Sequence, residues 1–424
     1  MGKVVKLESN ARRRAGRAAP PRKPRARTRK SKTALVLGGG GITGAVYEIG
    51  ALRALDLLSV NRSVNQFDVY VGTSAGALIA ALTANGVTPE QMMRVVNDQG
   101  PTSFRDVNVG MLLRPNYREF AAKGMRLPLH LVSVARSLAR SVASFNTVEL
   151  ALALADALPS GLYSGTGLEE YVRTVLSDPD RTDDFRRLEP ELYLAATDLD
   201  TCERIVLGAE GWDDVPISSA VRASAALPMV YQPVRIRGRE LVDGGIVSTT
   251  NLDIAVEAGA RFIVVVNPLV PFVNDFTSET PTLLGTKVRR VSDMGFPQIG
   301  YQAFKLLAYQ RLHEMASQWQ ERYPGVDIVL IEPDPDDELM FQTNILDYAS
   351  RLDIARHGFE SVTVRLASDY EQLREVAGRH GIEISATRVR KVIRHFEVEQ
   401  EKSRAWRRIL EQTTSALLRQ SSAD

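Results

Sequence analysis

Short runs of consecutive apolar residues alternate along this chain with longer segments whose apolar positions recur every three or four residues. The apolar runs predict strands at residues 33–38, 67–71, 192–197, 204–207 and 262–267. The periodic segments predict helices between them, at residues 44–58, 75–84, 217–226 and 252–258. Strands that alternate with helices, and that are apolar throughout, indicate an α/β layer fold with a largely parallel sheet buried on both faces.

Three segments depart from this alternation. Residues 1–32 are an Arg/Pro/Ala-rich tail with too little apolar surface to offset the entropy of ordering, so we expect disorder there. Strand patterns are scarce between about 91 and 177, which predicts a helical insertion in a main domain of residues 33–275. Residues 276–424 are mainly helical, at 298–322, 352–366 and 388–418, with one run at 327–332 that would add an edge strand.

Residues 129–145, inside the insertion, form an amphipathic pattern in which Arg136 and Arg140 are spaced four apart among Leu, Val and Ala. This pattern fits an ordinary helix that packs its apolar face on the core. It also fits a lid or a helix that contacts a membrane surface.

The charge is distributed unevenly. The net charge of +2 combines a tail of 32 residues, with 13 Lys or Arg and the single acid Glu8, and a remainder with 40 basic and 50 acidic residues. A basic tail can be a solvated extension, or it can bind anionic membrane or nucleic acid by charge.

The sequence favours a cytoplasmic protein without a membrane span. The single cysteine, Cys202, excludes an intrachain disulfide and a cysteine-based zinc site, and it fits a reducing compartment. No apolar stretch follows the basic tail, as a secretory signal requires, and the tail's prolines do not suit an organelle transit peptide. The longest uncharged run, residues 69–89, contains Gly72, Gly76 and Gly86 and is better explained by a strand, a turn and a buried helix.

The sequence Gly72-Thr-Ser-Ala-Gly76 has the G-x-S-x-G spacing between a predicted strand and a predicted helix. Flanking glycines permit a tight turn that exposes the serine hydroxyl, and the positive end of the helix favours the negative charge of acyl transfer. Ser74 is therefore a candidate nucleophile.

A second glycine-rich loop, Gly38 to Gly44, also lies between a strand and a helix. Taken alone, its G-x-G-x-x-G spacing is compatible with dinucleotide binding, but Asp68 opens the next strand instead of ending it. The alternative is an oxyanion hole formed by backbone N–H groups.

A nucleophilic serine needs a base, and none of the five histidines lies in a recognisable catalytic context; they are His130, His313, His357, His380 and His395. Asp243 is a better candidate, because it ends a predicted strand and precedes Gly244 and Gly245, which leave room for a substrate. A simple turn would also explain Asp-Gly-Gly in isolation.

Together the three motifs resemble a known family. In order and spacing, Gly39–Gly44, Gly72–Gly76 and Asp243–Gly245 are similar to the oxyanion loop, nucleophile elbow and Asp-Gly-Gly/Ala motif of patatin-like phospholipases. Two further segments, Leu194–Leu199 and Arg222–Pro228, and Asn251 extend the resemblance over about residues 33–270.

The resemblance implies a three-layer α/β/α fold and a lipid acyl hydrolase with a Ser74–Asp243 dyad, with no cofactor or metal. It implies that the N–H groups of Gly39, Gly40 and Gly41 hold the oxyanion. An aspartate is a weak base unless burial raises its pKa, so the dyad requires a desolvated site. Because the substrate would be a lipid, we expect residues 1–32 and 129–145 to contact an anionic membrane and do not expect them to bind nucleic acid.

One position departs from the family pattern. The family loop has Arg or Lys directly before its last glycine, where this chain has Thr43. This difference keeps a second hypothesis open, a lipid-binding or regulatory protein on the same fold with weak or absent catalysis. A third, a nucleotide-binding oxidoreductase, rests on the glycine loop alone.

Overall fold

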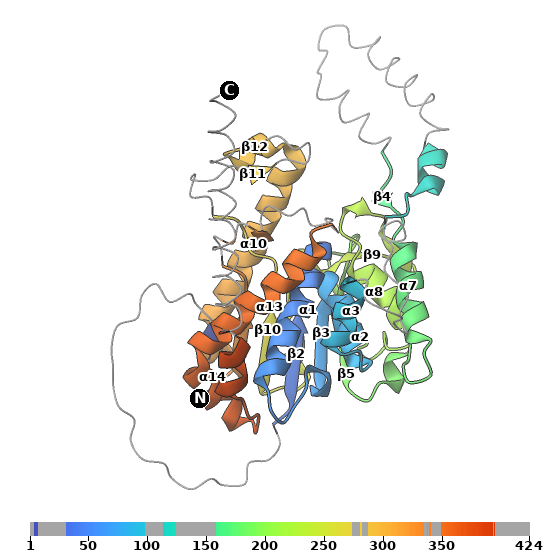
Figure 1. Ribbon diagram of the computed structural model, residues 1–424. Coiled ribbons are helices and arrows are strands. Elements are labelled where there is room, and N and C mark those ends of the chain that lie inside the picture. Colours follow the sequence, from blue (N-terminus) through green and yellow to red (C-terminus); the bar gives the residue numbers. More distant parts are fainter. Residues whose placement is uncertain are drawn as a thin grey trace, which may run out of the picture.

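A nine-stranded sheet is the centre of the described part of the molecule (Figure 1). The computed structural model describes residues 4–6, 31–97, 113–123, 158–273, 280–281, 287–334, 337, 339–340, 349–392 and 394. The strands follow the order β1-β13-β10-β2-β3-β5-β9-β8, with β6 also paired to β5. The strands from β1 to β5 in this order are parallel, whereas β6, β8 and β9 add antiparallel pairs.

The strands of this sheet are β1 (Val4–Lys6), β2 (Thr33–Leu37), β3 (Val69–Thr73), β5 (Glu191–Asp198), β6 (Arg204–Leu207), β8 (Val234–Ile236), β9 (Arg239–Asp243), β10 (Phe262–Val266) and β13 (Asp327–Ile331). Two small sheets pair β4 (Gly161–Tyr163) with β7 (Met229–Tyr231), and β11 (Thr280–Pro281) with β12 (Lys287–Val288).

The helices are α1 (Gly41–Leu58), α2 (Ala75–Ala84), α3 (Pro89–Val96), α7 (Thr166–Leu176), α8 (Ile217–Ser224), α9 (Asp253–Glu257), α10 (Phe296–Ser317), α11 (Trp319–Arg322), α13 (Arg351–Ser368) and α14 (Tyr370–Arg379). Short 3₁₀ turns add Val64–Gln66, Phe185–Arg187, Gly244–Ile246 and Val291–Met294.

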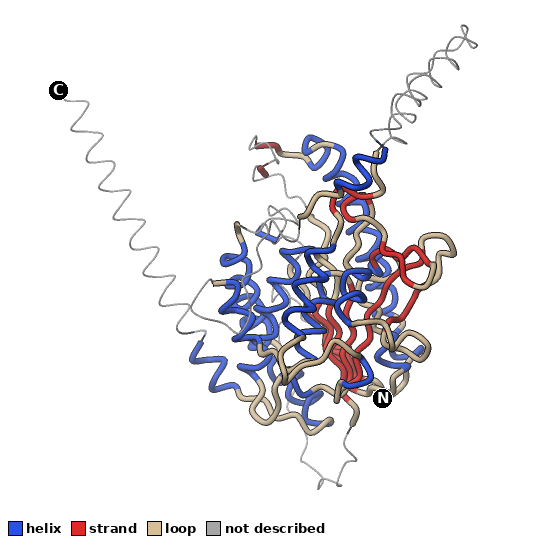
Figure 2. The backbone as a smooth tube through the Cα atoms, turned by 90° about the vertical axis from the view of Figure 1, so that its right-hand side faces the viewer, coloured by secondary structure: helices blue, strands red, loops and turns tan. Residues whose placement is uncertain are grey.

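The central strands are apolar throughout because their two faces belong to two different cores. In β2, Leu35 and Leu37 pack into one core and Ala34 and Val36 into the other. The first core contains residues of α1, α2, α3, α7, α8, α13 and α14, and the second contains residues of α9, α10 and α11. The result is the expected α/β/α arrangement, with helices over both faces of the sheet (Figures 1 and 2).

The N-terminal segment contributes more to this sheet than the sequence predicted. Val4–Lys6, inside the segment expected to be disordered, forms β1 along β13, since a short β-branched run can pair with an open parallel edge. The run at 327–332 is therefore not an edge strand, because β13 lies between β1 and β10.

Other predicted elements are found close to their expected bounds, and some lie outside the described residues. Helix α13 packs closely on α1, where a side chain at Gly50 or Gly358 would collide with the facing helix. The described parts of the insertion comprise α3, a helix at 117–123, β4 and α7, whereas residues 129–145 are not described. No helix within the described ranges is long and apolar enough to cross a membrane.

Candidate active site

Ser74 occupies a strained turn between β3 and α2. Its backbone has φ 56° and ψ −121°, a combination that side-chain-bearing residues rarely adopt and that is typical of a nucleophile elbow. A Cβ atom on Gly72 would lie 2.6 Å from Cα of Ala77, and a Cβ atom on Gly76 would overlap the carbonyl oxygen of Leu37. The two glycines are thus required for the close packing of β2, β3 and α2 around the serine.

A second serine, Ser224, holds the elbow in place. The N–H of Ser74 donates to Oγ of Ser224 at 3.0 Å, and this hydroxyl donates to the carbonyl of Ala195 at 2.6 Å. Ser224 is fully buried at the end of α8. It therefore connects the strained turn to strand β5.

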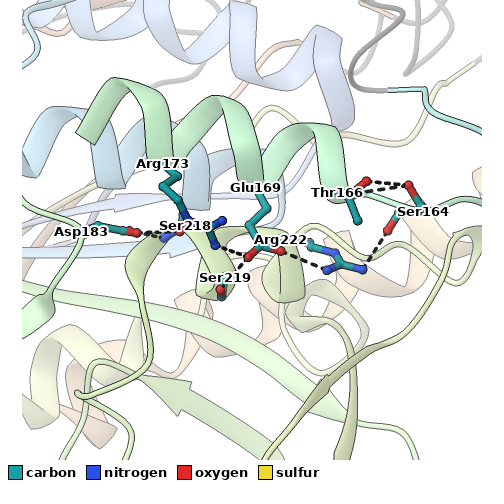
Figure 3. A network of polar contacts seen from close by, with 8 residues as sticks. All are labelled: Ser164, Thr166, Glu169, Arg173, Asp183, Ser218, Ser219 and Arg222. Atoms are coloured by element: carbon teal, nitrogen blue, oxygen red, sulfur yellow. Dashed lines mark hydrogen bonds and ion pairs between the residues drawn. The ribbon is translucent and has the colours of Figure 1, made fainter. Parts of the chain in front are cut away.

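Helix α8, which carries Ser224, is fixed to α7 by a network of polar contacts (Figure 3). Glu169 accepts hydrogen bonds from Ser219 at 2.9 Å and from Arg222 at 3.0 Å, and it also pairs with Arg173. Arg222 donates in addition to the carbonyl of Ser164 at 3.0 Å. Arg222 of the family-like segment is thus a structural anchor, because its charge is neutralised by Glu169.

The glycine loop lies directly against the elbow. Gly38 accepts a hydrogen bond from the N–H of Gly76 at 3.1 Å, and a Cβ atom on Gly39 would lie 3.3 Å from Cβ of Ser74. Gly40 could not carry a side chain either, since its Cβ atom would lie 2.9 Å from Cγ of Pro268. Gly40 is thus packed too closely for a side chain, and Gly39 leaves little room for one.

The backbone N–H groups of this loop differ in availability. The N–H of Gly39 donates to the carbonyl of Thr249 at 3.1 Å in this arrangement. That the amides of Gly39, Gly40 and Gly41 hold an oxyanion stays a prediction. The amides of Gly40 and Gly41 have no acceptor among the described residues. Thr43 lies in the next turn, 4% exposed, and its hydroxyl donates to the carbonyl of Gly40 at 3.2 Å.

Strand register brings Asp243 to Ser74. Thr73 is paired with Ala195, and the next residue of β5, Ala196, is paired with Asp243, so the serine and the aspartate lie at the same level on the two strands that flank β5. Gly244 packs against Ala195, where a side chain would overlap its carbonyl oxygen.

Asp243 is 2% exposed, and its carboxyl accepts a hydrogen bond from the N–H of Gly245 at 2.7 Å. Burial raises the pKa of Asp243 to about 6, against the opposing effects of the nearby Ser74 side chain and of the Gly245 N–H. The aspartate is thereby a stronger base than an exposed carboxylate.

Helix N-termini supply positive potential at the same place. Neither α1, which begins at Gly41, nor α2, which begins at Ala75, has a side-chain cap or an acidic residue in its first turn. Their helix dipoles therefore favour an anion near Ser74.

An apolar pocket of about 180 Å³ opens at this site. Ser74, Asp243 and the loop Gly39–Gly41 line one end, and Tyr301 and Phe304 of α10 line the same end. The remaining lining residues are mainly aliphatic and come from α1, α2, α3, α7 and the segment around β7. This apolar lining shields the carboxyl of Asp243 from water, which is the condition for its raised pKa.

The described histidines lie elsewhere. His313 binds Glu332 at 2.9 Å, His357 binds Asp337 at 2.5 Å, and His380 binds Asp327 at 2.8 Å. None of these three lines the pocket, and His130 and His395 lie outside the described residues. The described part of the chain contains no group of three His, Cys, Asp or Glu residues suited to a metal ion.

Sequence reasoning missed three residues that support the site. Ser224 lies within the family-like segment Arg222–Pro228, but nothing in its local pattern indicates its role, and nothing in the sequence marks Thr249 or Tyr301. Asn251, which extends the family resemblance, is fully buried with φ 48° and donates to Oγ1 of Thr73 at 3.0 Å, directly before the nucleophile. The family resemblance at Ser224 and Asn251 is the signal that could have identified their roles.

The fold and this constellation define an α/β protein with a serine–aspartate pair in an apolar pocket. The profile of the patatin-like phospholipase family matches residues 35–256. The chain belongs to that family, whose members are serine lipid acyl hydrolases.

Individual relatives and solved structures share only a low sequence identity with this chain. The chain is 22% identical over 229 residues to "Probable lipid hydrolase 463L" of Invertebrate iridescent virus 6, covering 53% of this chain. It is 26% identical over 227 residues to "Uncharacterized protein YqhO" of Bacillus subtilis (strain 168), covering 50% of this chain. The matched region spans 63% of the length of each relative.

Among solved structures, VipD from Legionella pneumophila has a TM-score of 0.33 and 16% identity, over 80% of this chain and 67% of that chain. Human GIVD cytosolic phospholipase A2 has a TM-score of 0.32 and 12% identity, over 83% of this chain and 60% of that chain.

Proposed function

We propose that this protein hydrolyses the carboxylic ester bonds of phospholipids or related lipids with Ser74 as nucleophile and Asp243 as base. One observation carries the proposal: Ser74 and the buried Asp243 line the same apolar pocket, and the Ser74 side chain is close enough to lower the pKa of the Asp243 carboxyl. A dyad of this kind needs a direct path for the proton and a desolvated base, and this proximity and burial support both.

In the first half of the reaction, Oγ of Ser74 attacks the ester carbonyl carbon and its proton passes to Asp243. The carbonyl oxygen becomes an oxyanion, which the free N–H groups of Gly40 and Gly41 and the N-termini of α1 and α2 stabilise. The tetrahedral intermediate then collapses, the proton moves from Asp243 to the leaving alcohol, and an acyl-serine remains.

In the second half, a water molecule attacks the acyl-serine and gives its proton to Asp243. Collapse of this intermediate releases the fatty acid, and the proton returns to Oγ of Ser74. Because the pKa of Asp243 is about 6, the carboxyl is mostly ionised at neutral pH and is still basic enough to accept a proton in the transition state.

The test compares wild type with Ser74→Ala on short-chain nitrophenyl esters and on a lysophospholipid. We expect the variant to lose at least about a thousandfold in kcat/KM, since loss of the nucleophile removes the covalent route. Ser177→Ala, which changes an exposed serine at the end of α7, is the matched control and should keep wild-type rates. Wild-type turnover by Ser74→Ala would show that another group performs the reaction.

A fluorophosphonate probe separates this proposal from a catalytically silent lipid-binding protein, the alternative favoured by Thr43. An active dyad predicts one covalent adduct per chain, located on Ser74 by peptide mass spectrometry and absent from Ser74→Ala. Lipid binding without labelling would support the silent alternative.

Peripheral contact with an anionic membrane belongs to the same proposal, through residues 1–32 and 129–145. Replacing the Arg and Lys residues between 7 and 30 with Gln should weaken binding to phosphatidylglycerol vesicles at low salt, while leaving Val4–Lys6 to pair with β13. Equal binding of wild type and variant at low salt would contradict a role of the tail.

A further inference from the structure

The pocket extends from Ser74 into the interior between α1 and α2. Both helices begin at the active site, one at Gly41 and the other at Ala75, and both lead away from it into the first core. One face of α1 lines the pocket with Ile42, Ala45, Val46 and Ile49. The facing stripe of α2 consists of Ala75, Leu78, Ile79 and Leu82.

The two helices give the same length for the pocket. The lining residues span eight residue steps from Ser74, directly before α2, to Leu82, and eight steps on α1, from Gly41 to Ile49. At a helical rise of 1.5 Å per residue, each stripe extends about 12 Å. An extended chain advances about 1.2 Å per bond, as a protein backbone does, so about ten carbons fill this length.

The inner end of the pocket is closed by buried side chains. Leu82, Val87 and Met92 line it and are at most 6% exposed, and α3 adds Val95 and Val96. One turn beyond Ile49, α1 carries Arg53, whose Nε binds Glu90 of α3 at 2.9 Å. This ion pair is exposed to solvent and does not line the pocket, so the apolar stripe of α1 ends at Ile49.

We propose that α1, α2 and α3 form a molecular ruler that selects medium-chain acyl groups of about ten carbons, with Met92 of α3 at the stop. The proposal rests on the hydrolase function proposed above and specifies its substrate class. An acyl chain shorter than the ruler leaves apolar wall uncovered, and a longer one meets buried side chains.

Chain-length dependence tests the ruler. We expect kcat/KM of the wild type for saturated nitrophenyl esters to rise about fourfold per methylene from four carbons, to peak near ten and to fall clearly by sixteen. A continuous rise to sixteen carbons would overturn the proposal. Because the wild-type profile decides this point, the test does not depend on the folding of any variant.

A matched pair of variants tests the stop. Met92 and Met93 are neighbours on α3 with 4% and 6% exposure, but only Met92 lines the pocket. Met92→Ala should move the optimum to longer esters by about two carbons, because it removes three heavy atoms from the closed end. Met93→Ala should lose comparable stability and keep the wild-type profile. Identical profiles of the two variants would rule out Met92 as the stop.

Binding separates failure of the ruler from failure of the hydrolase proposal. Calorimetric titration of Ser74→Ala with saturated fatty-acid methyl esters measures chain fit without turnover. If affinity stops increasing near ten carbons, the ruler stands even if the wild type hydrolyses none of the esters. If affinity increases through sixteen carbons, the ruler is wrong even if the wild type is an active hydrolase.

Discussion

Replacing Asp243 with asparagine should make the protein inactive and, at neutral pH, more stable. The carboxyl is 2% exposed and burial raises its pKa to about 6, so ionisation is less favourable in the folded protein than in the unfolded chain. Tyr301 of α10 also faces it, and burial together with the charge of Asp243 raises the pKa of this phenol. An asparagine at this position would keep a side-chain oxygen for the N–H of Gly245 and would carry no charge.

The magnitude follows from the two pKa values. A carboxyl with a raised folded-state pKa supports stability below its unfolded value and loses that support as pH rises through the folded value. With values of about 3.8 unfolded and about 6 folded, the ionisation penalty is about 1 kcal/mol at pH 4.5 and about 3 kcal/mol at pH 8. The stability of Asp243→Asn relative to wild type should therefore increase by about 2 kcal/mol over this range.

Urea unfolding of both proteins at several pH values between 4.5 and 8 measures this difference. Only its pH dependence is diagnostic, since any packing cost of asparagine is the same at each pH. Ser74→Ala is the control. It is also inactive but keeps the carboxylate, so its stability relative to wild type should not increase with rising pH. A constant difference between Asp243→Asn and wild type would refute the raised pKa.

Three further predictions concern the same site. The kcat/KM of the wild type for a nitrophenyl ester should rise with pH to a plateau, with a midpoint near 6, because only ionised Asp243 accepts the proton; a midpoint near 4 would contradict this. Ser224→Ala should lower kcat about tenfold or more with little change in KM, because the N–H of Ser74 loses its acceptor; steady-state kinetics on the same ester measure this. Gly76→Ala should destabilise the protein by about 3 kcal/mol or more, because its Cβ atom would overlap the carbonyl of Leu37. Gly86→Ala, where nothing lies within 4 Å, should cost only about 1 kcal/mol in the same urea titration.

The sequence predicts those elements whose pattern follows from burial alone. Helix α2 has the predicted bounds, Ala75–Ala84, and β2, β3, β5 and β10 lie within one or two residues of the predicted runs. These strands are covered on both faces, so most of their positions are apolar and the run is easily identified. Ser74 and Asp243 are accessible to sequence reasoning for a different reason: each lies between a strand and glycines that the close packing requires.

Contacts between distant segments are not encoded in a local pattern. Val4–Lys6 forms a strand only because β13 offers a partner more than 300 positions later in the sequence. The carbonyl of Thr249 accepts a hydrogen bond from the N–H of Gly39, and nothing in the glycine loop itself distinguishes this amide from those of Gly40 and Gly41. The pairing of Ser224 with the elbow likewise depends on the packing of α8.

Thr43 shows how the structure changes the meaning of a departure from the family pattern. In the sequence, the missing Arg or Lys raised the question of what stabilises the oxyanion and the loop. In the structure, the Thr43 hydroxyl binds the carbonyl of Gly40, and Gly38 and Gly39 are bound to β10, α2 and Thr249, so the loop is held without a cation. Positive potential comes from the uncapped N-termini of α1 and α2, which meet at Ser74. Uncharged groups can thus take both roles expected of the missing cation, so Thr43 does not by itself argue against the proposed catalysis.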